Sequence, residues 1–159
     1  AGAVTAPREE MDEIGVVHTY EQELSGEAME GGPLMLSWQD VQMASLDTPA
    51  DEPAYNVVIH EFAHVLDLRD GVADGTPLLP NDAARGQWQS ALQGEFDYFC
   101  ERVVCGHDTV IDPYGAESID EFFAVASEAF FVAARSLKEE QPAMYRLLSS
   151  YYRQDPAVY

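Results

Sequence analysis

The chain has 159 residues, of which 47% are hydrophobic, enough for one buried core but too few for two. Its 29 acidic residues outnumber its 8 basic residues and give a formal net charge of -21. Such a surface repels phosphate backbones and anionic lipid, which argues against nucleic-acid and membrane partners and favours cations or basic peptides. No apolar run approaches the ~18 residues that span a bilayer, and no secretory leader is visible, so we expect a cytoplasmic protein with a single domain over residues 1–159.

The first forty residues predict short strands. Residues 1–13 are small, polar and acidic, and predict an extended or loose arm. The β-branched stretch at residues 14–20 predicts a strand, residues 26–32 interrupt the pattern with glycines, and residues 33–36 predict a second short strand. We therefore expect a small N-terminal β-sheet.

The rest of the chain predicts helices. The first begins at Asp51 or Glu52 and ends at Gly71, and its apolar residues cover most of its circumference, so we expect it to be central. A loop over residues 72–81 follows, and then further helices over residues 82–104, 118–135 and 143–154. The expected fold class is a helix-rich α+β domain.

The first of these helices carries the motif H-E-x-x-H at residues 60–64. Residues four apart share one helix face, so His60 and His64 can bind the same metal ion, and Glu61 falls beside them. Catalytic Zn²⁺ needs a third protein ligand and an open position for water, whose proton Glu61 can remove as general base. The motif therefore predicts a zinc-dependent hydrolase.

Several carboxylates compete to be the third ligand. Asp70 stands at the ligand position of the pattern H-E-x-x-H-x-x-G-x-x-H, but Asp67 replaces the glycine that turns the chain there, which disfavours Asp70. Asp67 itself can orient an imidazole or cap the end of the helix. The later helix offers Glu121, which can alternatively form a capping box with Ser118, and Glu128, which suits support of a metal-bound histidine.

Two segments together resemble a known family. The stretches HEFAHVLD at residues 60–67 and EFFAVASEAFF at residues 121–131, with residues 25–38 upstream, resemble the Mlc titration factor A family of bacterial zinc peptidases. The catalytic domain of anthrax lethal factor is similar at a greater distance, and there a tyrosine precedes the E-F-F-A motif by seven residues. Tyr114 stands seven residues before Glu121 here.

The resemblance implies a gluzincin-like, zincin-like domain in which Glu121 is the third zinc ligand. It also implies that Tyr114 donates to the oxyanion that forms on the attacked carbonyl, although Tyr114 can equally serve a turn at residues 112–115. The family implies cytosolic peptidases that act on amino-terminal residues and bind a glucose repressor. Relative to it, we expect the chain to lack a longer amino-terminal segment.

Two functions remain open at this point. The first is a peptidase that binds a short peptide along a strand such as residues 34–36 and hydrolyses it, in the manner of an aminopeptidase. The second is a regulatory binding protein that keeps the zinc but sequesters a protein partner, such as a transcriptional repressor, through its acidic face. Glu61 favours the peptidase, because a binding protein has no evident need of a general base.

Overall fold

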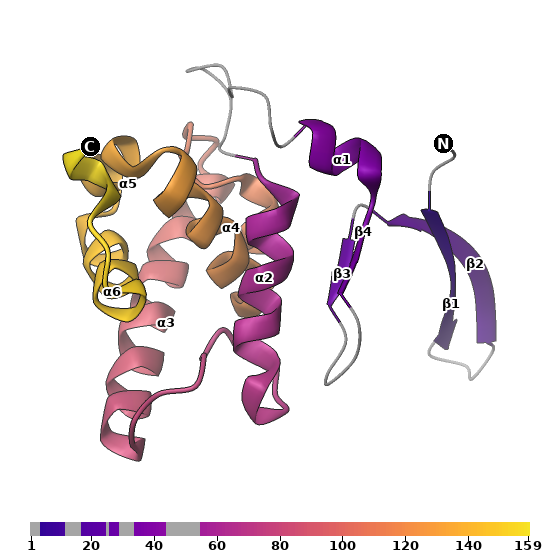
Figure 1. Ribbon diagram of the computed structural model, residues 1–159, viewed down its shortest axis with the longest axis horizontal. Helices are drawn as coiled ribbons and strands as arrows, with labels where there is room; N and C mark the ends of the chain where they lie inside the picture. Colours follow the sequence, from indigo (N-terminus) through magenta and orange to yellow (C-terminus); the bar gives the residue numbers. More distant parts are fainter. Residues whose placement is uncertain (1–3, 12–16, 25, 29–33, 44–54) are drawn as a thin grey trace.

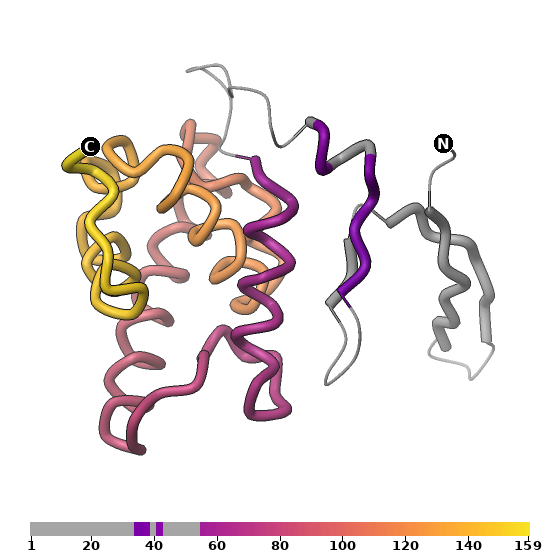
Figure 2. The backbone as a smooth tube through the Cα atoms, viewed as in Figure 1, coloured from indigo at the N-terminus to yellow at the C-terminus, as the bar shows by residue number. Residues whose placement is uncertain are grey.

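The computed structural model describes the backbone of residues 4–11, 17–24, 26–28, 34–43 and 55–159 (Figure 1), and the side chains of residues 34–38, 41–42 and 55–159 (Figure 2). Within these ranges the chain is helix-rich, and the strands precede the long helices (Figure 1). The strands are β1 (Val4–Met11), β2 (Val17–Leu24), β3 (Gly26–Ala28) and β4 (Leu34–Leu36). The α-helices are α1 (Trp38–Met43), α2 (Val57–Asp67), α3 (Asp82–Val104), α4 (Ile119–Val132), α5 (Ala134–Glu140) and α6 (Pro142–Tyr152), with short 3-10 helices η1 (Leu68–Asp70), η2 (Pro113–Ala116) and η3 (Pro156–Val158).

The described strands form two separate antiparallel pairs. β1 pairs with β2 and places Val4 opposite Leu24, whereas β3 pairs with β4 and places Ala28 opposite Leu34. Residues 4–11 therefore form a strand where the composition predicts an extended or loose arm, while the remaining residues of that arm lie outside the described ranges. The described strands do not join into the one small N-terminal sheet expected from the sequence, which stays a prediction. Of the two pairs, β3–β4 is the one that contacts α2.

The centre of the hydrophobic core is α4. Every residue from Phe122 to Phe130 is buried, because most of them are apolar and the helix is packed by α2, α3, α5 and α6. Aromatic rings fill the spaces between the helices: Trp88 of α3 meets Phe123 edge-on, and Tyr152 of α6 stacks on Phe130. The core is thus built on the helix that also carries Glu121.

The helix with the H-E-x-x-H motif is not buried all round, which corrects the expectation of a central helix. In α2 the side chains of Phe62 and Val65 are 53% and 36% exposed, while Glu61 and Asp67 are buried. The reason is that His60, Glu61, Ala63 and His64 take up the inward face, so Phe62 and Val65 turn outward. The prediction from apolar content that α2 is buried all round is therefore wrong, and the buried central helix is α4.

Helix boundaries follow local capping. α2 begins at Val57, because the Asn56 side chain accepts a hydrogen bond from the Ile59 N–H and caps the helix. Asp51 and Glu52, the start expected from the sequence, lie outside the described residues. The expected stop is confirmed, since Gly71 adopts a left-handed φ of 87° after η1. The predicted bounds of α3 are confirmed, whereas the helix expected over residues 118–135 is divided at Ala133 into α4 and α5. No helix in the described part of the chain is both long and apolar enough to cross a membrane.

Candidate metal centre

Two histidines converge on one side of α2. His60 and His64 lie one turn apart, and their Nε2 atoms are 3.1 Å from each other. Their side chains are 15% and 14% exposed, so both imidazoles are largely withdrawn from water. This is the shared helix face that the four-residue spacing predicts.

A carboxylate from α4 completes the group. The Glu121 Oε2 atom lies 3.2 Å from His60 Nε2 and 3.4 Å from His64 Nε2. Ser118 is the N-cap of α4, but its side chain makes no capping hydrogen bond, so a capping box does not explain Glu121. Glu121 instead faces α2, as the family resemblance implies.

The three atoms fit a tetrahedral metal. With Zn–N and Zn–O bonds of ~2.0–2.1 Å, a tetrahedral site needs ligand atoms separated by roughly 3.3–3.4 Å, and the observed separations are 3.1, 3.2 and 3.4 Å. The Glu121 Oε2 atom is also buried without a hydrogen bond of normal geometry from any described residue. In the part of the chain whose side chains are described, these three residues are the one group of His, Cys, Asp or Glu side chains with this convergence.

The electrostatics of the group favour a bound positive charge. Burial disfavours the charged form of His60, but the Glu121 and Glu128 carboxylates outweigh burial and raise the pKa of His60 to about 10. Burial likewise disfavours the Glu121 carboxylate, yet the His60 and His64 imidazoles beside it lower its pKa to about 2. The site therefore attracts a cation, whether a proton or a metal ion.

Glu128 holds both His60 and the start of α2. Its side chain is 2% exposed, and its Oε1 atom accepts a hydrogen bond of 2.8 Å from His60 Nδ1. Its Oε2 atom accepts from the backbone N–H of Asn56, the N-cap of α2. Because Nδ1 donates to Glu128, Nε2 is the ring atom left to exchange its proton for a metal ion, and it lies beside His64 and Glu121. This is the supporting role that the sequence predicts for Glu128.

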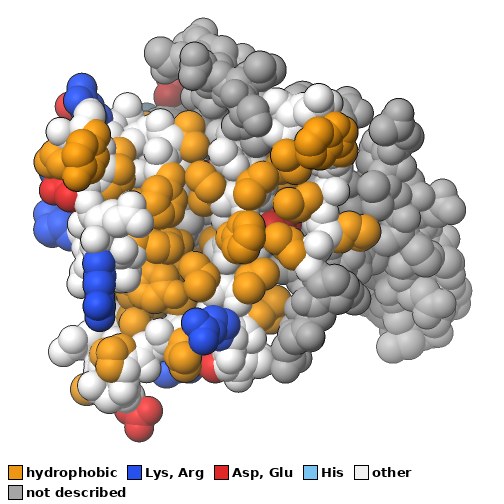
Figure 3. All heavy atoms as spheres, in the orientation of Figure 1, with side chains coloured by type: hydrophobic (Ala, Val, Ile, Leu, Met, Phe, Trp, Pro, Cys, Tyr) orange, Lys and Arg blue, Asp and Glu red, His pale blue; other side chains and the backbone are white. Residues whose placement is uncertain are grey.

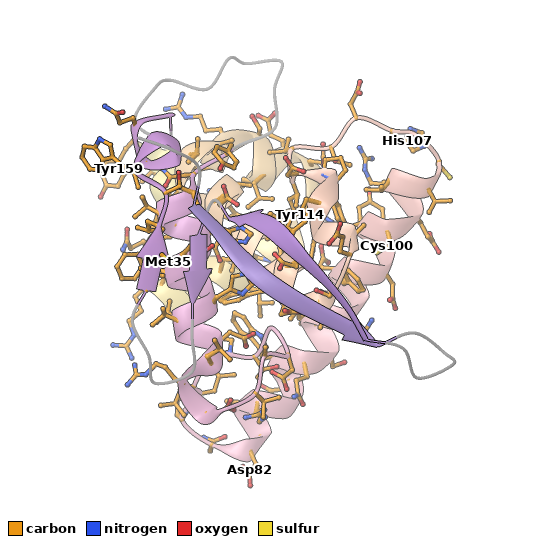
Figure 4. All side chains as sticks on the ribbon, turned by 90° about the vertical axis from the view of Figure 1, so that its right-hand side faces the viewer. Met35, Asp82, Cys100, His107, Tyr114 and Tyr159 are labelled. Atoms are coloured by element: carbon orange, nitrogen blue, oxygen red, sulfur yellow. The ribbon has the colours of Figure 1, made fainter. Side chains whose placement is uncertain are left out.

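Glu61 and Tyr114 lie next to the group on different elements. Glu61 follows His60 on α2, and its side chain is only 6% exposed. Tyr114 belongs to η2, and its ring centroid is 6.2 Å from that of His60. Burial and the nearby Glu121 carboxylate raise the pKa of Tyr114 to about 12, so its phenol keeps its proton at neutral pH. Figure 4 shows Tyr114 near the middle of the side on which the strands lie, whereas His107 is at the edge.

The turn interpretation of Tyr114 also has support, and the two roles are compatible. The Asp112 side chain accepts a hydrogen bond of 2.8 Å from the Tyr114 N–H, which fixes the backbone of η2. The Tyr114 side chain is not used in that turn and is 46% exposed. The backbone thus serves the turn while the phenol remains beside His60.

The other candidate carboxylates serve the loop that follows α2. Asp70 forms an ion pair with Arg85 of α3 and lies outside the group, so its candidacy as third ligand is wrong. Asp67 neither orients an imidazole nor caps α2, because its Oδ2 atom accepts a hydrogen bond of 2.9 Å from the Gly75 N–H. The sequence interpretation missed Asn56, although an Asn directly before an apolar run is a recognisable N-cap.

Comparisons with known proteins point to one family. The family described as glucose-regulated metallo-peptidase M90 matches residues 1–153. Mlc titration factor A of Pectobacterium atrosepticum is 40% identical over 159 residues, which cover 98% of this chain and 57% of that protein. Mlc titration factor A of Yersinia enterocolitica is 38% identical, covering 91% and 53% of the two chains, and an uncharacterized protein of Synechocystis is 34% identical, covering 90% and 51%. The chain thus spans about half the length of the curated relatives it matches.

Proposed function

The chain belongs to the glucose-regulated metallo-peptidase M90 family, and on that premise we propose that it is a zinc-dependent peptidase whose metal is held by His60, His64 and Glu121. The observation that carries this proposal is the convergence of the three ligand atoms, from two helices, within 3.1–3.4 Å of one another. Zinc in this position would supply a Lewis acid and lower the pKa of water toward ~7.

The chain's own residues supply the remaining chemistry. Glu61 is the general base, which takes the proton of the attacking water and passes it to the leaving amine. Tyr114 keeps its phenolic proton and donates a hydrogen bond to the oxygen that becomes negative on the attacked carbonyl. Glu128 fixes the tautomer and the orientation of His60 through the Nδ1 hydrogen bond.

The substrate class follows from charge and from β4. A net charge of -21 attracts the ammonium group of a short peptide, which supports an aminopeptidase-like preference for amino termini. β4 contacts α2 and pairs with β3 as its neighbour among the described strands, so its other edge offers backbone groups to an extended peptide. The side chain of Met35 on this strand is 38% exposed and would contact such a peptide.

The variant Glu61→Gln tests the proposal. It removes the base while keeping the size of the side chain, so zinc content should equal that of the parent and turnover of a mixed peptide pool should fall by about 10³-fold or more. Glu139→Gln on the exposed side of α5 removes the same charge and should leave turnover unchanged. Mass spectrometry of the products with and without chelator measures cleavage and terminal preference together. Cleavage by Glu61→Gln at the parent rate would sink the assigned role.

A second function has one specific observation in its favour. Two of the relatives are named Mlc titration factor A. If Mlc is the glucose repressor that the family resemblance implies, this name supports a regulatory protein that binds and sequesters a transcriptional repressor. Phe62 and Val65 are exposed on α2, about 140–200° around the helix from His60. Figure 3 shows apolar side chains over the face of the molecule to which α2 and α6 contribute, with basic groups at its edge. Contacts on this side of α2 would leave the metal centre untouched.

The two functions separate on removal of metal. Sequestration predicts that partner binding survives chelation and falls on Phe62→Ser, with no peptide cleaved in the pool. A peptidase function predicts instead that peptides are cleaved, that chelation abolishes this turnover, and that Phe62→Ser leaves the metal centre intact. Calorimetric titration of the purified repressor into chelated and zinc-loaded protein provides the comparison.

A further inference from the structure

The metal ligands come from two helices that touch each other, so the site depends on how α2 and α4 are placed along their contact. Near the start of α2, Glu128 of α4 binds both His60 and the Asn56 N–H. Near the end of α2, Asp67 lies two turns beyond His60 on nearly the same face and is fully buried. His60, His64 and Glu121 lie between these two points of attachment.

Asp67 is attached to α4 through one glycine of the loop over residues 71–81. The Gly75 N–H donates to Asp67, and the Gly75 carbonyl accepts a hydrogen bond of 2.9 Å from Trp88 Nε1 of α3. Gly75 also lies against the first residue of α4, because a Cβ built on it would be 2.8 Å from the Ile119 carbonyl oxygen and 2.8 Å from Leu92 Cδ2. Its φ of +70° disfavours any larger residue as well. Three helices therefore meet at a position that has no room for a side chain.

Stability alone does not account for Asp67. The side chain is 0% exposed, and its Oδ1 atom has no hydrogen bond of normal geometry from the described residues. A buried carboxylate with an unpartnered oxygen costs free energy that a smaller or apolar residue would not cost. The carboxylate instead fixes the distance between the end of α2 and Gly75 through its hydrogen bond with the Gly75 N–H.

We propose that Asp67 and Gly75 are positioning residues of the metal centre, which set the distance between α2 and the start of α4 and so place Glu121 against His60 and His64. Ile119 is two residues before Glu121, so a displacement of the first turn of α4 moves the third ligand directly. Glu128 fixes one end of the two ligand-bearing helices, and the Asp67–Gly75–Ile119 contact fixes the other. The inference rests on the proposed zinc site but does not depend on which substrate is cleaved.

The test measures zinc affinity by competition with a chromophoric chelator, in the parent and in variants shown to be folded by circular dichroism. Asp67→Ala removes the acceptor for Gly75 and should weaken zinc binding by at least about tenfold. Asp67→Asn keeps an acceptor oxygen of the same reach and should restore affinity to within about threefold of the parent. Gly75→Ala keeps Asp67 but pushes against Ile119, and should weaken binding as Asp67→Ala does.

A matched control separates positioning from general stability. Met144→Ala removes a fully buried side chain of α6 and should lower stability by about 2–5 kcal/mol without changing zinc affinity. The inference is overturned if Asp67→Ala and Gly75→Ala bind zinc like the parent, if Asp67→Asn loses as much as Asp67→Ala, or if Met144→Ala loses as much as either. A parent protein that binds no zinc would instead overturn the metal site itself, and the positioning role with it.

Discussion

Glu128→Gln offers a quantitative test of how the centre is held. Glu128 accepts from two donors, His60 Nδ1 and the Asn56 N–H, with one oxygen for each. A glutamine has the same shape but one acceptor oxygen, so one donor must face an NH₂ group in a place where Glu128 is 2% exposed. The substitution therefore breaks one of the two hydrogen bonds and weakens the other.

The expected magnitude follows from those two bonds. A hydrogen bond to a charged group stabilises by about 1.5–3 kcal/mol and a neutral one by about 0.5–1.5 kcal/mol. Loss of one charged bond and neutralisation of the second should lower the free energy of unfolding by about 3 kcal/mol. For a chain of this size that corresponds to a fall in Tm of roughly 6–12 °C. Zinc affinity should fall by about 10–100-fold, because His60 loses the partner that orients its ring.

Urea unfolding of the chelated protein and chelator competition for zinc measure the two effects separately. Glu139→Gln is the charge-matched control and should change neither. A Glu128→Gln protein with parent stability and parent zinc affinity would refute the reasoning. A fall in stability with unchanged affinity would show that Glu128 serves the start of α2 rather than the imidazole.

Three further predictions concern the tyrosine, the buried aspartate and the metal. Tyr114→Phe should lower kcat by about 10²–10³-fold with parent zinc affinity, measured by steady-state peptide hydrolysis, and an unchanged kcat would exclude the donor role. Burial, and the charges of Asp74 and Asp120, raise the pKa of Asp67 from 3.8 to about 6, so the folded protein holds this proton more tightly than the unfolded chain. Ionisation of Asp67 therefore costs no stability below pH 3.8 and about 3 kcal/mol above pH 6. Urea unfolding between pH 4 and 7 measures this cost: as pH rises, the free energy of unfolding of the parent should fall by about 3 kcal/mol relative to that of Asp67→Asn. When free zinc is held at 100 times its Kd, its removal should lower the free energy of unfolding by about 2.7 kcal/mol and the Tm by roughly 5–11 °C. An equal Tm with and without zinc would mean that no metal binds the folded state.

The sequence by itself determined the chemistry of the site. The spacing of His60 and His64 places both imidazoles on one face of any helix, so their convergence needed no knowledge of the fold. The boundaries of α3 and the stop at Gly71 were equally readable, because glycine and the capping residues act through local backbone geometry. The proximity of Glu121 came from family resemblance, since nothing in the spacing of residues 64 and 121 indicates that they meet.

Only the tertiary structure decided which helix is buried and what the other carboxylates do. Composition favoured α2 as the central helix, but its polar inward face turns Phe62 outward, and α4 takes the centre. Asp70 and Asp67 stood at positions typical of a ligand and a cap, yet one pairs with Arg85 and the other with the Gly75 N–H. Periodicity reports which residues share a face of one helix, whereas partners supplied by α3, α4 or a distant loop depend on packing between elements, and that packing places Glu121 against His60 and His64.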